Sequence, residues 1–168
     1  MSIHLTKWRM FVAIALAVLL LDQVSKAWIV SALELYETVP LIEPVLSITR
    51  TENMGIFLGL GSGLGSPVFF VLSLAITLVI VYLYRDLPED ATFQKIGLSL
   101  AMGGGVGNML DRLQHGVVID FVHITIPNVL SNVSNFADHA LTLGVIIMFV
   151  DGVRWELQNS KPRVEESV

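Results

Sequence analysis

Residues Pro67 to Tyr84 read PVFFVLSLAITLVIVYLY and contain no charged side chain. A helix crosses a hydrocarbon core of about 30 Å with roughly 20 residues, and this segment nearly fills that length without a charge. The whole chain has the same character, with 54% hydrophobic residues, 15% charged residues and a mean hydropathy of +0.71. Soluble domains usually carry about 25% charged residues. The sequence therefore predicts an integral membrane protein.

Three further segments are long and apolar enough to cross a membrane, so we expect four transmembrane helices in a single membrane domain of residues 1–168. The expected fold class is a membrane all-α protein with a small β element, in which a short-stranded platform stands on the outer face. The expected spans cover about 8–30, 67–84, 96–112 and 136–153. The expected outer segments cover about 31–66 and 113–135, and a C-terminal tail covers 158–168.

Lysine and arginine gather at one set of helix ends, which indicates how the chain is oriented. Cytoplasmic flanks of membrane helices retain these residues. Lys7 and Arg9 precede the first span, Arg85 and Lys95 lie between the second and third, and three more basic residues follow the fourth. Both termini are therefore expected in the cytoplasm. A cleaved N-terminal signal peptide is the alternative, and we disfavour it because no small-x-small site follows the first apolar run.

The two outer segments contain patterns that are typical of β-strands. Between Tyr36 and Leu60, β-branched residues and prolines indicate short strands joined by turns. Residues 116–126 form a β-branched run that ends at Pro127. These runs predict the strands of the outer platform.

A pair of opposite charges lies near the outer end of the first span. A charged residue at membrane depth costs about 2.5 to 3.5 kcal/mol on insertion scales, so each one needs a partner, a watery cavity or a function. Asp22 and Lys26 stand four residues apart with the acid first, which is the better order for an ion pair along a helix. A structural salt bridge and a direct role in chemistry both explain this pair.

The segment from Gly103 to Arg112 reads GGGVGNMLDR and combines small with polar residues. Its first and fifth residues, Gly103 and Gly107, form a G-x-x-x-G face on which another helix can pack closely. It is not a nucleotide-binding loop, because no strand precedes it and no Gly-Lys-Ser/Thr closes it. Asn108, Asp111 and Arg112 share one helix face near the outer boundary. We expect Asp111 to pair with Arg112, which leaves Asn108 in need of a partner.

Two aspartates stand out on the outer side of the predicted topology. Asp120 lies in the apolar run Val117–Val122, where desolvation should raise its pKa. Asp138 enters the fourth span, and taken alone it reads as an N-cap or a partner of the helix dipole. Two carboxyl groups that meet cannot both ionise, so they share a proton. Such a pair can activate water with one member and protonate a departing amine with the other, which is sufficient for peptide hydrolysis without a metal.

Other catalytic groups fit the sequence less well. Four histidines, at positions 4, 115, 123 and 139, form no H-E-x-x-H cluster, and the chain contains no cysteine, so we expect no metal and no cofactor. No G-x-S-x-G elbow indicates a serine nucleophile. The net charge of −5 argues against nucleic acid as a partner.

Two different functional classes also use charged residues inside a membrane. A proton-coupled transporter or channel would distribute ionisable groups from one membrane face to the other. The second span contains none, and the notable acids lie toward one boundary, which favours an enzyme. A non-catalytic assembly subunit that packs through its glycine faces would tolerate replacement of Asp120 and Asp138.

Four short motifs resemble those of the bacterial lipoprotein signal peptidases, also called signal peptidase II, a family of integral membrane aspartyl endopeptidases. They occur in the order of that family and extend over almost the whole chain. The motifs are DQVSK at 22–26, GGGVGNMLDR at 103–112, VIDF at 118–121 and NFAD at 135–138.

The resemblance implies a function and a set of site residues. Enzymes of this family remove the signal peptide from diacylglyceryl-modified prolipoproteins by cutting before the lipidated cysteine. The resemblance also implies a location in the bacterial inner membrane, with the active site toward the outer, periplasmic face. It implies a monomer in contact with membrane lipid. The implied catalytic dyad is Asp120 and Asp138; the implied pocket and substrate-binding residues are Asn108, Asp111, Arg112 and Asn135; and the implied supporting residues are Asn53, Asp22 and Lys26.

The chain departs from the family pattern at two positions. In the family's N-x-G-x-x-F motif, which starts here at Asn53, the aromatic residue comes one position early, at Phe57. The family commonly has a phenylalanine before the N-x-A-D motif, and this chain has Ser134 at that position. Neither departure involves the implied dyad.

Overall fold

The computed structural model describes residues 2–55 and 65–159 and contains four long helices and four strands in this part of the chain. The apolar runs of the sequence form the helices, and the β-branched runs form the strands. The helices are α1 (Ser2–Ala32), α2 (Ser66–Asp86), α3 (Thr92–His115) and α4 (Phe136–Asn159). The strands are β1 (Thr38–Ile42), β2 (Leu46–Asn53), β3 (Val118–Ile126) and β4 (Leu130–Ser134).

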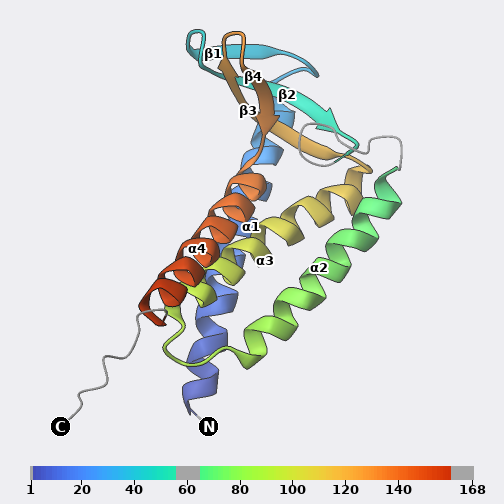
Figure 1. The fold of residues 1–168 in the computed structure, drawn as a ribbon. Coiled ribbons are helices and arrows are strands. Elements are labelled where there is room, and N and C mark those ends of the chain that lie inside the picture. The colour runs from blue at the N-terminus through green and yellow to red at the C-terminus, as the bar shows by residue number, and fades with distance from the viewer. Residues whose placement is uncertain (1, 56–64, 160–168) are drawn as a thin grey trace, which may run out of the picture.

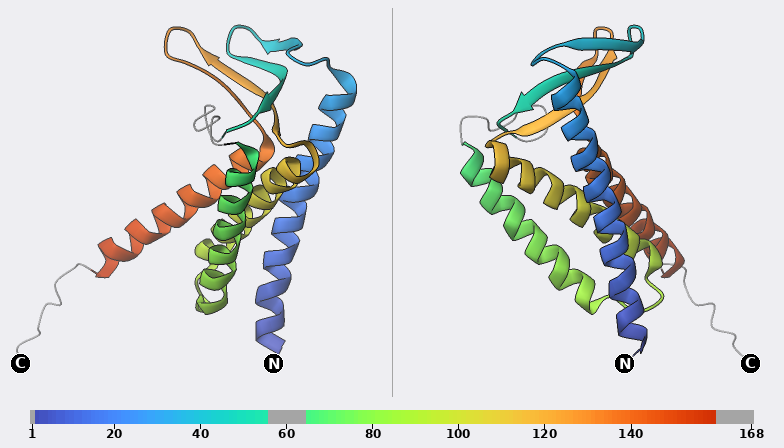
Figure 2. Two further views of the ribbon diagram at one scale, coloured as in Figure 1. Left: turned by 90° about the vertical axis from the view of Figure 1, so that its right-hand side faces the viewer. Right: turned by 180° about the vertical axis from the view of Figure 1, so that it is seen from behind.

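The four strands form one antiparallel sheet in the order β1-β2-β3-β4. Two hairpins contribute its halves, and the pairing of β2 with β3 joins segments that are separated by α2 and α3 in sequence. The sheet stands at one end of the helices, while the start of α1 and the end of α4 lie at the opposite end (Figures 1 and 2). The predicted platform is therefore present, and both chain ends described here lie away from it.

α3 is the central helix of the bundle and packs on α1, α2 and α4. Glycines allow these close contacts, as the sequence predicted. A Cβ atom added at Gly103 would lie 2.6 Å from Val18 Cβ of α1, and one at Gly104 would collide with the carbonyl oxygen of Ala137 in α4. Farther from the sheet, Gly97 and Gly144 bring α3 and α4 together in the same way.

An apolar core closes the end of the bundle opposite the sheet. Tyr84 is fully buried there, and its hydroxyl donates a 2.8 Å hydrogen bond to the carbonyl oxygen of Lys7. The Lys7 ammonium in turn donates to the carbonyl oxygens of Arg85 and Leu87, at 3.0 and 2.7 Å, and so satisfies the C-terminus of α2. The buried residues of this core are Phe11, Ile80, Tyr84, Leu98, Ala101 and Met102.

The outer surface of three helices is apolar, which fits a bilayer and not water. Large side chains such as Leu20, Val71 and Phe149 are more than 60% exposed. Segments Lys7–Ala32, Pro67–Asp86 and Phe136–Gln158 are long and apolar enough to cross a membrane. The prediction of a mostly helical membrane protein with a small sheet is confirmed. α3 is not apolar enough to be counted among the membrane-crossing helices, because glycines and polar residues occupy its enclosed positions.

The helices extend beyond the expected spans. α4 continues to Asn159, and residues 160–168, which make up most of the expected tail, lie outside the described part. α3 continues past 112 to His115 and ends at Gly116, which has a positive φ of 75°. Strand β4 was not predicted, because its sequence LSNVS is short and mostly polar; the Pro127-Asn128 turn before it was the available signal.

Candidate active site

Asp120 lies on β3 with its carboxylate held between two amide donors. Asn53, at the end of β2, donates to Oδ2 at 3.0 Å, and Asn135 donates to Oδ1 at 2.6 Å. The carboxyl group is 2% exposed. Burial, followed by the nearby Asp138 carboxylate, raises the pKa of Asp120 to about 7, and the amide donors oppose this rise. The predicted direction of the shift and its main cause are therefore those found.

Asp138 lies in the first turn of α4, but it does not cap that helix. The cap is Asn135, whose side-chain oxygen accepts a 2.9 Å hydrogen bond from the backbone N–H of Asp138. Asp22 of α1 provides a second acceptor for the same helix end, at 3.0 Å from the N–H of Ala137. The reading of Asp138 as an N-cap is therefore wrong, and its carboxylate is available to the neighbouring α3.

Two asparagines link the carboxyl groups of Asp120 and Asp138. Asn108 donates to Asp138 Oδ1 at 2.7 Å, and its own oxygen accepts from Asn135 Nδ2 at 3.2 Å. Because Asn135 Nδ2 also donates to Asp120, a continuous chain of hydrogen bonds runs from one acid to the other. Asn108, which lacked a partner in the sequence, therefore belongs to this link.

A second group of acids lies behind this link and is paired with a lysine. The Lys26 ammonium is 2.7 Å from Asp22 Oδ2 and 2.8 Å from Asp111 Oδ2, and all three side chains are almost fully buried. Lys26 also donates to Asn108 Oδ1 at 3.0 Å, so the ion cluster touches the asparagine link. The predicted Asp22–Lys26 ion pair is confirmed, and the expected Asp111–Arg112 pair is wrong because Lys26 of another helix pairs with Asp111 instead.

Arg112 contacts backbone carbonyls at the edge of the site. Its guanidinium donates to the carbonyl oxygens of Asn108 at 3.1 Å and Gly55 at 2.8 Å, and it lies 5.7 Å from the ring centre of Phe69. Gly55 N–H donates to Asn53 Oδ1 at 2.9 Å. Arg112 therefore fixes the backbone beside the residue that holds Asp120.

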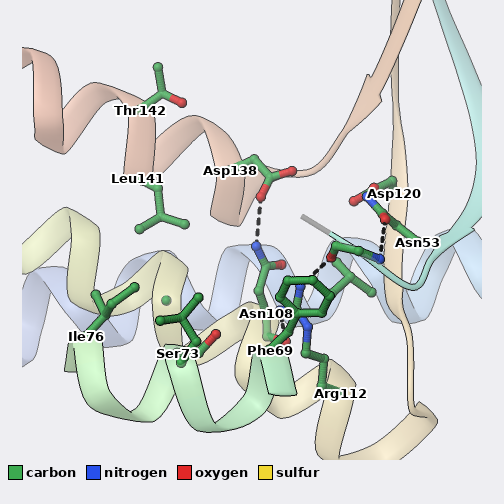
Figure 3. Close-up of a pocket in the computed structure, with 14 residues that line it drawn as sticks. Asn53, Phe69, Ser73, Ile76, Asn108, Arg112, Asp120, Asp138, Leu141 and Thr142 are labelled. Atoms are coloured by element: carbon green, nitrogen blue, oxygen red, sulfur yellow. Dashed lines mark hydrogen bonds between the residues drawn. The ribbon is translucent and has the colours of Figure 1, made fainter. Parts of the chain in front are cut away.

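A cavity of about 370 Å³ lies between α2, α3, α4 and the sheet. Asp120 and Asp138 both face it, with Asn53 and Arg112 nearby, while Ser73, Ile76 and Leu141 lie toward its other end (Figure 3). Its lining residues are Asn53, Gly55, Phe69, Leu72, Ser73, Ile76, Gly105, Asn108, Arg112, Val118, Asp120, Asp138, Leu141 and Thr142. Over residues 2–55 and 65–159, no group of three His, Cys, Asp or Glu side chains is arranged to hold a metal ion.

Sequence reasoning also missed a role for Gln23 and the apolar lining. Gln23 donates to Asp111 Oδ1 at 2.8 Å, and its place inside the DQVSK motif was a signal that it belongs to the ion cluster. The lining from α2 carried no signal, because apolar residues of a span look alike until the helix is oriented. Of the two departures, Ser134 is buried within hydrogen-bonding distance of His139, and Phe57 lies outside the described residues.

Three helices long and apolar enough to cross a membrane, with two carboxyl groups beside one cavity and a sheet at one end of the bundle, define a membrane protein with an enclosed polar site. Residues 14–154 match the family described as signal peptidase (SPase) II. The chain belongs to that family, as its motifs predicted.

Relatives and solved structures agree with this assignment. The lipoprotein signal peptidase of Geobacillus kaustophilus is 37% identical over 82% of this chain and 88% of its own length, and that of Geobacter metallireducens is 31% identical over 92% and 96%. A bacterial membrane enzyme structure superposes with a TM-score of 0.82 and 30% identity, covering 95% of this chain and 94% of the other. A second structure described in the same words gives 0.74 and 28%, over 84% and 91%.

Proposed function

We propose that this protein is an aspartic endopeptidase that cuts diacylglyceryl-modified prolipoproteins before the lipidated cysteine. Membership of the signal peptidase II family makes it a protease that processes lipoprotein signal peptides. The aspartic mechanism is supported by one observation above the others. Asp120 and Asp138 face the same cavity and are linked through amides, and the ion pairs among the described residues include neither of them.

The proposed chemistry divides the work between the two carboxyl groups, which hold one proton between them. The ionised member removes a proton from water, and the water oxygen adds to the carbonyl carbon of the scissile peptide. The protonated member donates a hydrogen bond to the carbonyl oxygen of the substrate. When the tetrahedral intermediate collapses, the C–N bond breaks and the nitrogen of the cysteine takes a proton from the dyad. No metal is needed for these steps.

The remaining site residues are proposed to position the dyad and substrate. Asn108 and Asn135 each contact one acid and each other, so they fix the separation of the carboxyl groups. Asn53 and Arg112 border the cavity, where a peptide backbone needs donors. The supporting pair, Asp22 and Lys26, holds Asp111 and the start of α4 in place.

We further propose that all four helices cross the bacterial inner membrane as one domain. α3 is enclosed by three apolar helices, so its own low hydropathy is compatible with spanning. Basic residues Lys7, Arg85 and Arg154 lie at the end away from the sheet, which favours cytoplasmic termini and a periplasmic active site. The protein is proposed to act as a monomer in contact with lipid.

A proton-coupled transporter receives no support from the described residues. α2 contributes Phe69, Leu72, Ser73 and Ile76 to the cavity and no ionisable group. In the described part of the chain, an apolar core around Tyr84 fills the opposite end of the bundle.

Cleavage of a lipidated prolipoprotein peptide by purified variants tests the aspartic mechanism. Asp120→Asn and Asp138→Asn should each lower kcat/KM by about 10³-fold or more, because each removes one partner of the acid–base pair. The matched control is Asp90→Asn, an exposed carboxyl at the far end of the bundle, which should leave the rate unchanged. Thermal unfolding verifies that the variants are folded. Full activity in either dyad variant would reject the proposal.

A further inference from the structure

The glycines in the segment 103–107 differ in what their missing side chains make room for. Cβ atoms at Gly103, Gly104 and Gly107 would each collide with α1 or α4. Among the atoms of the described residues, none lies within 4 Å of a Cβ added at Gly105. Gly105 also lines the cavity, and it is only half-buried. Helix packing therefore explains three of these glycines and leaves Gly105 unexplained.

The space at Gly105 lies one helical turn from the dyad. On α3, Gly105 precedes Asn108 by three residues, and on α4, Leu141 and Thr142 follow Asp138 by three and four residues, so each step is about 5 Å along a helix. In both helices the step leads away from the sheet. Ser73 and Ile76 of α2 complete this part of the cavity (Figure 3). An extended peptide advances about 3.3 Å per residue, so this space lies one or two residues from the scissile bond.

We propose that Gly105, with Ser73, Ile76, Leu141 and Thr142, forms the subsite for the side chain of the signal-peptide residue that precedes the scissile bond, and that the absence of a side chain at Gly105 sets the largest residue accepted there. This inference rests on the proposed function. It assigns Gly105 a role in specificity and none in the chemical step.

The size of the space selects this occupant over the diacylglyceryl group. A cavity of about 370 Å³ is at the low end of the range for small-ligand pockets, and it must also hold the scissile peptide and a water molecule. Two long acyl chains exceed what remains. The apolar lining continues from the acids away from the sheet, which suits an apolar side chain of the substrate.

Substituting Gly105 while varying one residue of the substrate tests the inference. Lipidated prolipoprotein peptides carry Gly, Ala or Leu before the scissile bond. The kcat/KM for the peptide with the largest residue that the unaltered enzyme accepts is divided by the kcat/KM for the Gly peptide. In Gly105→Val, kcat/KM for the large residue should fall by at least about 10-fold relative to Gly, since small volume differences in apolar pockets give 10- to 200-fold discrimination. Gly105→Ala should shift this ratio in the same direction by a smaller factor, and it supplies the test if the valine variant does not fold.

The chain offers a matched control in Gly152 of α4. A Cβ at Gly152 also meets no described atom within 4 Å, but this glycine is exposed and outside the cavity, so Gly152→Val should leave the ratio unchanged. An unchanged ratio in an active Gly105→Val enzyme overturns the inference. A fall in the ratio that disappears when the acyl chains of the substrate are shortened also overturns it. Neither result affects the dyad, whereas an unaltered protein that cleaves none of the peptides rejects the proposed function itself.

Discussion

Two groups of carboxylates lie around α3, and they differ in how their charge is compensated. Asp22, Asp111 and Asp120 are buried, and Asp138 is half-buried. Asp22 and Asp111 share the ammonium of Lys26, at 2.7 and 2.8 Å. Asp120 and Asp138, connected to the first group through Asn108, receive side-chain hydrogen bonds only from neutral amides within residues 2–55 and 65–159, and both face a cavity. Each group therefore contains a fully buried carboxyl group, so burial alone does not distinguish them, and the partner decides what a carboxyl group can do. The ammonium of Lys26 engages its two partners in ion pairs, whereas amides orient a carboxyl group without adding a charge.

The largest expected effect comes from removing the cation. Lys26→Met should lower the free energy of unfolding by about 3–5 kcal/mol, because it leaves two buried carboxylates without a counter-charge. Denaturation in detergent micelles measures this loss. Lys95→Met is the matched control, since Lys95 is also buried but contacts the carbonyl and the exposed carboxylate of Glu89. Equal losses in the two variants would contradict the importance of the Lys26 cluster.

A smaller effect is expected from filling the space beside the ion cluster. A Cβ at Gly107 would lie 2.6 Å from Asp22 Oδ2, so Gly107→Ala should displace Asp22 and lower the free energy of unfolding by about 1–3 kcal/mol. Gly105→Ala makes the same change two residues earlier without a contact and should raise stability by up to about 1 kcal/mol, because alanine favours helix. Unfolding of the two variants side by side measures the contrast. A stable Gly107→Ala protein would show that Asp22 is not rigidly held.

The sequence predicted those features that depend on local pattern. The four helices and the strand around Asp120 followed from apolar and β-branched runs, and the Asp22–Lys26 pair followed from its spacing of four residues. The partner of Asp111 could not be predicted, because Lys26 is on another helix and only packing brings the two together. The residues of α2 that line the cavity could not be predicted either, because an apolar sequence does not indicate which face of the helix contacts protein and which contacts lipid.

Asn135 allows the structural and chemical roles of an amide to be separated. Its oxygen caps α4 and its nitrogen donates to Asp120, so Asn135→Ala should cost about 1 kcal/mol of stability and also reduce activity. Asn135→Ser keeps an oxygen that can cap α4, but it lacks the amide group that donates to Asp120. This variant should therefore unfold near the original temperature and still lose activity. Measuring Tm and kcat/KM for both variants tests this. Activity that follows stability in both variants would argue for capping alone.

The smallest effect concerns the pH at which the dyad loses its proton. Burial and the Asp138 carboxylate raise the pKa of Asp120 to about 7, above an unfolded value of about 3.9. The folded protein therefore binds this proton more tightly, and the stability it contributes is present below about pH 4 and is lost as the pH rises through about 7. Activity that requires the shared proton should fall over the upper part of the same window.

Replacing Asn53 should move that limit in a defined direction. Asn53 donates to the ionised form of Asp120 and lowers its pKa, so Asn53→Ala should shift the alkaline limb of the kcat/KM profile upward, by about one pH unit if the hydrogen bond contributes about 1.4 kcal/mol. Asn132→Ala on β4 is the control, because Asn132 donates to neither acid. A profile unchanged by Asn53→Ala would mean that the limb reports a group other than Asp120. The carboxyl groups that lack a cation would then not be the ones whose proton limits the reaction.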